Sequence, residues 1–261
     1  MQILLANHST YPRVGEGAQA QRLRRAYADR ETGKIDDAGW DEIARSYVAE
    51  VIAEQESAGL DVVTDGLVYA YDVVSHPASR LENVSIGGIV RFFDTNTYVR
   101  QPEVNGTPAG SFGLASDFAR AKPLATKELK QVVVGPYTLA KHSIIQGNGD
   151  GLHRVALAYA DALANDLAEL ATAGATIVQI DEPSLLRNPE DAELVRQLLQ
   201  RATANTTIKT VLTTFFGDAT PVYGELIQMP VDVLGFDLIY GPTLVDAIVA
   251  TPPGKSLALG A

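Results

Sequence analysis

Short apolar runs alternate along this chain with longer segments in which apolar residues recur every three or four positions. The clearest case is residues 153–172, a predicted helix whose apolar face is formed by Val155, Leu163, Leu167 and Leu170. A glycine, a β-branched run over residues 175–180 and the polar turn Asp181-Glu182-Pro183 follow. The same order of helix, glycine, apolar run and acidic turn occurs earlier, over residues 40–66. This repetition predicts βα units and a parallel sheet.

Seven apolar runs are expected to form strands. They cover residues 3–6, 60–65, 131–134, 175–181, 208–216, 231–238 and 256–261. Helices are expected over residues 40–58, 153–172 and 193–202, and Asp36 or Asp37 is expected to cap the first. We expect a single domain over residues 1–261, a (β/α)₈ TIM-type barrel that lacks its last strand. Either the chain is a fragment or something else closes the gap, because an unpaired gap exposes sheet edges.

The segment from about residue 67 to residue 130 interrupts this alternation. Residues 85–93 and 97–100 are expected to form a β-hairpin around the turn Asp94-Thr95-Asn96. A Gly-, Ser- and Pro-rich stretch over residues 105–116 is expected to be a loop. We interpret the segment as an insertion after the second strand that covers the barrel mouth, because functional loops of barrels extend from that face.

Composition and charge restrict the partners of the chain. The formal net charge of −11 argues against nucleic acid, anionic membranes and other polyanions as general partners. The sequence contains no cysteine, which excludes disulfides and thiolate zinc sites. The amino-terminal residues lack the features of a signal peptide, and no apolar run approaches the roughly 20 residues that span a bilayer. We therefore expect a cytoplasmic protein.

Two predicted strand ends carry candidate functional carboxylates. Asp181 and Glu182 follow the apolar run at residues 175–180, and Asp65 follows the run that begins at residue 60. Ligands of α/β proteins bind at the carboxyl ends of the strands, so these side chains are expected to line a site. The alternative is that Asp181 and Glu182 cap the next helix and that Asp65 only forms a turn.

Basic residues and histidines are further candidates for ligand binding. The segment Arg-Leu-Arg-Arg-Ala at residues 22–26 is basic in an otherwise acidic chain. It is either a solvated helix face or an anchor for an anionic ligand tail, since guanidinium groups bind carboxylates bidentately. The four histidines lack the spacing of metal ligands, and each is expected in a loop or on the surface: His8, His76, His142 and His153.

Four motifs lie in order along nearly the whole chain, at residues 11–15, 55–66, 135–139 and 179–183. Together they resemble the family of cobalamin-independent methionine synthases, and several co-linear motifs are far more specific than any one of them. The resemblance implies enzymes built of two face-to-face (β/α)₈ barrels. The C-terminal barrel of the family binds zinc and homocysteine, and the N-terminal barrel, a degenerate copy, helps to bind the methyl-folate.

The chain resembles the N-terminal barrel of this family more than the zinc-bearing one. The His-x-Cys pair of the zinc barrel falls here on Thr214 and Phe216, and its glutamate position falls near Asp237. Leu67 stands where the zinc barrel has the acidic residue that holds the amino acid's ammonium group. Motifs that resemble the N-terminal barrel lie at residues 93–98, 213–217 and 229–237. We expect this chain to bind no zinc, because Thr and Phe cannot replace a histidine and a thiolate.

The resemblance also implies roles for individual residues. Asp181 matches a position whose counterpart in the zinc barrel grips the substrate amino group. Glu182 is a further ligand-binding candidate, although capping or bracing the following loop is the stronger expectation. Arg13 and Arg24 match basic positions that would meet the glutamate tail of the folate, and plain surface charge is the alternative for both.

Residues of the hairpin and of the vacated metal position complete the candidate site. Asp94, Asn96 and Tyr98 either line the barrel mouth or merely close the hairpin. Thr213, Thr214 and Phe216 mark the position of the missing zinc ligands, and Phe216 is expected to fill that space.

The leading hypothesis is a methionine-synthase-like barrel that binds 5-methyltetrahydrofolate polyglutamate, the non-zinc half in methyl transfer to homocysteine. Its expected partner is a zinc-bearing methyltransferase barrel or a second copy of the chain. One alternative is a metal-independent enzyme of the uroporphyrinogen decarboxylase-like superfamily, using Asp65 and Asp181 for acid–base chemistry on a small acid. Another alternative is a non-catalytic remnant without a ligand.

Overall fold

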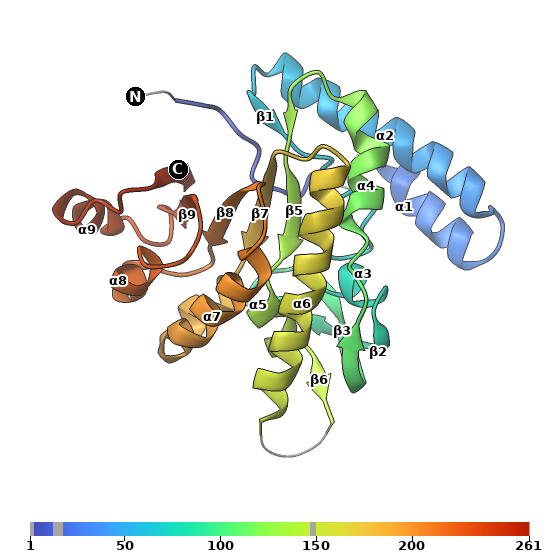
Figure 1. Cartoon of the computed structure of the whole chain (residues 1–261). Coiled ribbons are helices and arrows are strands. Elements are labelled where there is room, and N and C mark those ends of the chain that lie inside the picture. Colours follow the sequence, from blue (N-terminus) through green and yellow to red (C-terminus); the bar gives the residue numbers. More distant parts are fainter. Residues whose placement is uncertain (1–2, 13–17, 147–149, 261) are drawn as a thin grey trace. The chain divides into compact units, whose positions relative to one another are not determined.

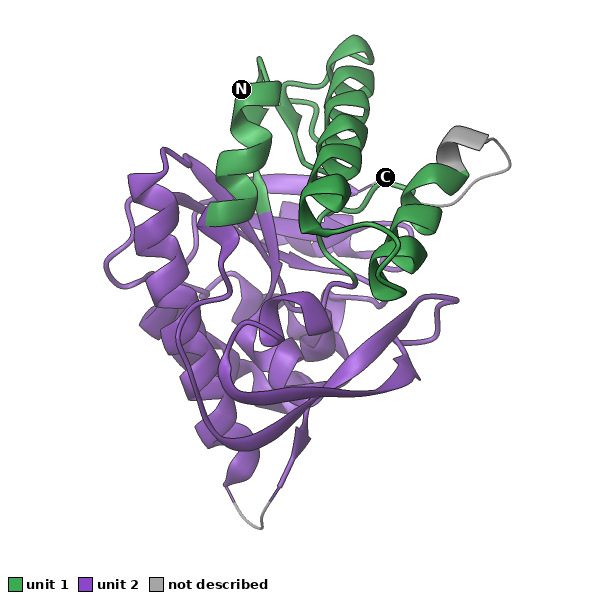
Figure 2. Cartoon of the chain, turned by 90° about the vertical axis from the view of Figure 1, so that its right-hand side faces the viewer, with its two compact units in different colours: residues 1–71, 116–131 green, residues 72–115, 132–261 purple. Residues whose placement is uncertain are grey.

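The computed structural model describes residues 3–12, 18–146 and 150–260 (Figure 1). The chain divides into two compact units, which Figure 2 shows in different colours. Unit 1 comprises residues 1–71 and 116–131, and unit 2 comprises residues 72–115 and 132–261. The segment interpreted from the sequence as an insertion, residues 67–130, is thus divided between the two units.

Unit 1 is built around the long helix α2, Asp37–Ser57. The side chain of Asp36 accepts a hydrogen bond from the backbone N–H of Gly39 at 2.9 Å, which confirms the predicted cap. Gly59 follows the helix with a φ of +84°, a left-handed conformation that suits glycine and ends the helix. The shorter helix α1, Ala18–Glu31, packs against α2. Residues buried on α2 include Trp40, Ala44, Val48, Val51 and Ile52.

The sheet of unit 1 is small. Its strands β1, Val62–Val63, and β4, Glu128–Leu129, pair in parallel. The prediction of a strand over residues 3–6 is wrong, because Ala6 makes a single bridge to Val62 and the side chain of Ile3 is 74% exposed. An apolar run forms a strand only where the backbone of a neighbouring strand pairs with it along its length. The neighbour here, β1, is only two residues long and cannot pair with the whole run.

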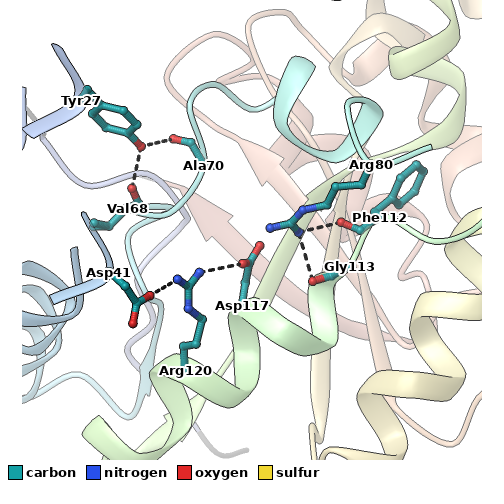
Figure 3. Close-up of polar contacts among 9 residues, drawn as sticks. All are labelled: Tyr27, Asp41, Val68, Ala70, Arg80, Phe112, Gly113, Asp117 and Arg120. Atoms are coloured by element: carbon teal, nitrogen blue, oxygen red, sulfur yellow. Dashed lines mark hydrogen bonds and ion pairs between the residues drawn. The ribbon is translucent and has the colours of Figure 1, made fainter. Parts of the chain in front are cut away.

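Figure 3 shows side-chain contacts within each unit. Helix α4, Leu114–Ala121, carries Arg120, which forms ion pairs with Asp41 of α2 and with Asp117. The guanidinium of Arg120 also lies 4.3 Å from the centre of the Tyr69 ring, within the range of a cation–π interaction. These contacts hold the end of α4 against α2 in unit 1.

Unit 2 contains a five-stranded sheet in the order β10-β9-β8-β7-β5. Its strands are β5 (Gln131–Val134), β7 (Ile177–Asp181), β8 (Lys209–Thr214), β9 (Val233–Asp237) and β10 (Ser256–Gly260). Strands β7 to β10 pair in parallel, and their order in the sheet follows their order in the chain. This confirms the predicted βα winding and an α/β fold. Among the described residues, β5 and β10 form the two edges of this sheet.

Helices connect successive strands of this sheet. They are α5 (Pro136–Lys141), α6 (Gly151–Thr172), α7 (Ala192–Thr203), α8 (Tyr223–Leu226) and α9 (Leu244–Ala250). Helix α6 packs against α5 and α7. Its predicted apolar face is confirmed, since each side chain is at most 1% exposed: Val155, Leu163, Leu167 and Leu170. Burial of each such side chain contributes about 1.5–3 kcal/mol. No helix of the described chain is long and apolar enough to cross a membrane.

A second sheet of unit 2 consists of β2 (Glu82–Arg91), β3 (Tyr98–Ala109) and β6 (Ile144–Ile145), and the short helix α3 (Ser75–Ala78) precedes it. Strands β2 and β3 form the predicted antiparallel hairpin. The prediction of a loop over residues 105–116 is wrong at both ends. Strand β3 continues to Ala109 because Glu82 pairs with that residue, and α4 begins at Leu114.

Candidate functional site

Asp181 ends β7, and its side chain is held by two hydrogen bonds. The Oδ1 atom accepts from the side-chain amide of Gln179 at 2.7 Å and from the hydroxyl of Thr213. Asp181 and Thr213 pair in register between β7 and β8, so both side chains project from the same face of the sheet. Among the described residues, Oδ2 of Asp181 accepts no hydrogen bond. The carboxylate is therefore fixed through one oxygen and can accept an N–H of a ligand through the other.

Glu182, the next residue, caps a helix that precedes it in the chain. Its Oε1 accepts from the backbone N–H of Tyr137 at 2.9 Å and its Oε2 from that of Thr138 at 2.7 Å. These amides belong to the first turn of α5, which follows the end of β5. Glu182 is fully buried, and burial raises the pKa of its carboxyl to about 7, against the opposing effect of the hydrogen bonds from Thr138 and Tyr137. The sequence predicts such a cap on the following loop, and the structure places it on α5.

Thr214 lies on the opposite face of β8 from Thr213, because successive side chains of a strand alternate. Thr214 is 2% exposed, and its hydroxyl has no hydrogen-bond partner within the described part of the chain. Thr213, rather than Thr214, is therefore the β8 residue that reaches Asp181.

Aromatic rings gather where the β2–β3 hairpin turns. Phe92 and Phe93 at the hairpin tip lie with ring centroids between 5.0 and 6.4 Å from those of His142 and Phe216. Because Phe216 follows β8, the hairpin tip packs on the loop at the carboxyl end of that strand. Phe93 and Phe216 have φ angles of 53° and 62°, which are rare for residues with a side chain and mark local backbone strain. Burial in this cluster lowers the pKa of His142.

The polar hairpin candidates lie beside this aromatic cluster. Asp94 pairs with Arg187 at 2.5 Å, and this arginine holds the pKa of the Asp94 carboxyl below its usual value. The guanidinium of Arg187 also lies 5.7 Å from the centre of the Phe93 ring. Asn96 is exposed in the turn, and Tyr98 is 54% exposed at the start of β3. The structure gives Asp94 an anchoring contact, and a ligand-binding role for these hairpin residues stays a prediction.

Three candidates belong to the amino-terminal part of the chain. Asp65 is buried and follows β1, and its Oδ1 accepts from the backbone N–H of Leu67 at 2.9 Å, which forms a turn. Arg24 is exposed on α1. Both belong to unit 1, whereas Asp181 belongs to unit 2. Arg13 lies outside the described residues.

A family model for the N-terminal domain of cobalamin-independent synthases matches residues 82–261. The chain belongs to this family. A 5-methyltetrahydropteroyltriglutamate–homocysteine methyltransferase of Streptomyces avermitilis is 33% identical over 178 residues, which cover 66% of this chain and 22% of that protein. A methionine synthase of Sulfurisphaera tokodaii is 27% identical over 226 residues, which cover 86% of this chain and 67% of that protein. The match thus spans about a fifth of the Streptomyces protein and about two thirds of the archaeal one.

Solved structures of cobalamin-independent synthases share the fold. A B12-independent methionine synthase from Shewanella sp. W3-18-1, in complex with selenomethionine, has a TM-score of 0.73 at 19% identity, over 87% of this chain and 72% of that chain. A putative vitamin-B12 independent methionine synthase from Listeria monocytogenes has a TM-score of 0.72 at 17% identity, over 97% and 80% of the two chains. At such identities the likeness concerns the fold.

The side chains at Thr214 and Phe216, where the resemblance places the zinc ligands of the other barrel, do not fit zinc. The Thr214 hydroxyl is buried on the face of β8 opposite to Asp181, and the ring of Phe216 offers no donor atom. Among the described residues, no group of three His, Cys, Asp or Glu side chains could hold a metal ion. His142 lies in the turn that follows α5, in agreement with the expected loop position, and its ring packs against Phe92 in the aromatic cluster.

Some residues that build the site were not singled out by sequence analysis. Gln179 appeared there only within a motif, although its spacing of two residues from Asp181 places both side chains on one face of a strand. Gly235 inside a predicted strand is a usable signal, because a glycine there often marks close approach of another group. The contacts of Thr213 and Arg187 had no such signal, because each partner lies far away in the chain.

Proposed function

We propose that this chain binds 5-methyltetrahydrofolate as the non-zinc half of a cobalamin-independent methionine synthase, in methyl transfer to homocysteine. The observation that carries the proposal is Asp181 at the carboxyl end of β7, held through Oδ1 and able to accept an N–H through Oδ2. Membership of the N-terminal domain family and the names of the curated relatives support the methyl-transfer context.

The chemistry assigns this chain a binding role. Methyl transfer needs a thiolate nucleophile, and zinc would supply it by holding a thiol in its ionised form. Because Thr214 and Phe216 do not fit zinc, we propose that a zinc-bearing barrel, in the same protein or in a partner, supplies that step. This chain would bind and orient the methyl donor at the carboxyl ends of its strands. We further propose that the sheet of unit 2 is part of a single (β/α)₈ barrel, which the likeness to methionine synthase structures supports.

The test is a calorimetric titration of the purified chain with 5-methyltetrahydrofolate triglutamate, without added zinc. We expect saturable binding that Asp181→Asn weakens about 10-fold or more, because a hydrogen bond to a charged group contributes about 1.5–3 kcal/mol. Asp161→Asn on α6 is the matched control, since Asp161 is exposed and pairs with Arg201. Absence of heat from a folded sample, or equal binding by wild type and Asp181→Asn, would contradict the proposal.

The role of the arginines is tested in the same titration. Arg24 and Arg25 are both exposed on α1, so Arg25→Ala is a matched control for Arg24→Ala. If Arg24 meets the glutamate tail, Arg24→Ala weakens binding of the triglutamate but not of the monoglutamate, and the effect shrinks at high salt. Equal losses for both variants would indicate general surface charge instead.

A further inference from the structure

Three neighbouring strands of unit 2 place an aspartate, a threonine and a glycine in one row. Asp181 of β7 pairs in register with Thr213 of β8, and Thr213 pairs with Gly235 of β9. We propose that Thr213 and Gly235, together with Gln179, are positioning residues that turn Oδ2 of Asp181 toward an N–H donor of the ligand. This inference rests on the proposed function, because it takes Asp181 as a ligand-binding residue.

The space beside Gly235 is filled by Thr213. A Cβ atom at position 235 would lie 2.5 Å from Cγ2 of Thr213 and 3.2 Å from its Cβ. Carbon atoms in contact stand roughly 3.5–4.0 Å apart, so any side chain at this position forces Thr213 to rotate or shift. Glycine inside a strand weakens that strand, and here its absence of a side chain accommodates the neighbouring threonine.

One rotamer of Thr213 satisfies both neighbours. The hydroxyl donates to Oδ1 of Asp181, and the methyl carbon of the same side chain lies next to Gly235. A β-branched side chain has few χ1 rotamers, so displacement of the methyl group also moves the hydroxyl. Gly235 therefore acts on Asp181 through Thr213.

Gln179 completes the arrangement from within β7. Its side chain is 1% exposed, and its amide donates to the same Oδ1 atom of Asp181 at 2.7 Å. Two donors on one oxygen fix the plane of the carboxylate and leave Oδ2 as an acceptor. The ligand group that matches it is an N–H donor, such as an amine, an amide or a heteroaromatic N–H, and not an anion.

Four variants separate the hydroxyl from the shape of Thr213. Thr213→Val keeps the shape and removes the donor, whereas Thr213→Ser keeps the donor and removes Cγ2. Gly235→Ala introduces the 2.5 Å clash with Cγ2, and the double variant Gly235→Ala/Thr213→Ser lacks the clashing atom. Each is titrated with 5-methyltetrahydrofolate triglutamate, and its melting temperature is measured. In parallel, the ¹³C resonance of the Asp181 carboxyl, assigned by its loss in Asp181→Asn, reports the carboxylate without any ligand.

We expect Thr213→Val and Gly235→Ala each to weaken binding about 10-fold and to shift the Asp181 resonance. Thr213→Ser is expected to stay within about 3-fold of wild type, and the double variant is expected to recover most of the affinity and the resonance that Gly235→Ala loses. The positioning role is overturned if the Asp181 resonance is unchanged in Thr213→Val. It is also overturned if the losses of affinity only follow the melting temperatures and the double variant Gly235→Ala/Thr213→Ser recovers no affinity. If the resonance behaves as expected while neither the wild type nor any variant binds the folate, the proposed function fails and Thr213 and Gly235 only fix the Asp181 carboxylate.

Discussion

The side chain of Glu182 occupies the place where any residue other than glycine at position 135 would carry its own side chain. A Cβ atom on Gly135 would lie 2.2 Å from the carboxyl carbon of Glu182. The same carboxyl group accepts hydrogen bonds from the first turn of α5, at Tyr137 and Thr138. Gly135 and Glu182 thus join the ends of β5 and β7 at the position where α5 begins.

Gly135→Ala is expected to destabilise the protein, because the added methyl group and the Glu182 carboxyl cannot share this space. Displacement of a buried, hydrogen-bonded side chain typically costs about 1–3 kcal/mol. Urea denaturation measures the effect as a lower midpoint at an unchanged slope. Gly224→Ala on α8 is the control, since a Cβ there meets nothing within 4 Å, and its free energy of unfolding should stay within about 1 kcal/mol of wild type. Equal stability of the two variants would contradict the contact between Gly135 and Glu182.

Glu182 is expected to make stability depend on pH near neutrality. Burial raises its pKa to about 7 from an ordinary value of 4.5, so the folded protein binds the proton more tightly than the unfolded chain. The free energy of unfolding should therefore fall as pH rises from 4.5 to 7. In Glu182→Gln the slope above pH 6 disappears, where Asp166 no longer contributes to it, and stability at pH 5 drops by about 1–3 kcal/mol because one backbone N–H loses its acceptor. Urea unfolding at several pH values between 6 and 7.5 measures this dependence. The same change of unfolding free energy with pH in wild type and Glu182→Gln would contradict the prediction.

Asp166 on α6 is expected to hold the loop between β3 and α4. Its carboxylate accepts from the backbone N–H groups of Phe112 and Leu114 at 2.5 and 2.8 Å. Figure 3 shows that Arg80 donates to the carbonyl of Phe112, at 2.7 Å. Asp166→Asn is expected to lower the free energy of unfolding by about 1–3 kcal/mol, because the NH₂ group of asparagine cannot accept the hydrogen bond of the backbone N–H that it faces. Amide hydrogen exchange at residues 112 and 114 should accelerate more than in the core of α6.

The control for Asp166 is Asp161→Asn, an exposed change on the same helix. Burial raises the pKa of Asp166 to about 6 from 3.8, so its contribution to stability also decreases as pH rises between these values. The decrease of stability between pH 3.8 and 6 should be smaller in Asp166→Asn than in Asp161→Asn, and Glu182 accounts for the decrease that remains. Persistence of the same slope in both variants would rule out Asp166 as its source.

Arg187 is expected to hold the hairpin tip through Asp94 and the ring of Phe93. In Arg187→Ala, backbone amides of residues 92–97 should exchange faster, with little change in global stability, because the ion pair is exposed. The pKa of Asp94 is lowered in the folded protein, so its contribution is present above the unfolded pKa and is lost as pH falls through the folded one. Exchange rates that match the wild type at neutral pH would show that the aromatic contacts alone hold the tip.

Local patterns in the sequence predicted those elements whose cause is local. Asp36 caps α2, the apolar spacing of α6 matches its buried face, and the turn at residues 94–96 joins the two strands of the hairpin. The predictions of a strand over residues 3–6 and of a loop over residues 105–116 were wrong for the same reason. Whether an apolar or Gly-rich run becomes a strand depends on the backbone that lies beside it, and that backbone comes from elsewhere in the chain.

The sequence by itself determined the βα winding, the family resemblance and the placement of Asp181 at a strand end. The tertiary structure decided what each side chain at that end does. Asp181 and Thr213 meet because β7 and β8 pair in one register, and a shift by one residue would bring Thr214 to that face instead. Glu182 meets Gly135 and the start of α5 because β5 and β7 are neighbours in the sheet. Such contacts join residues more than 30 positions apart, and strand register, which sets them, is a property of the packed sheet as a whole.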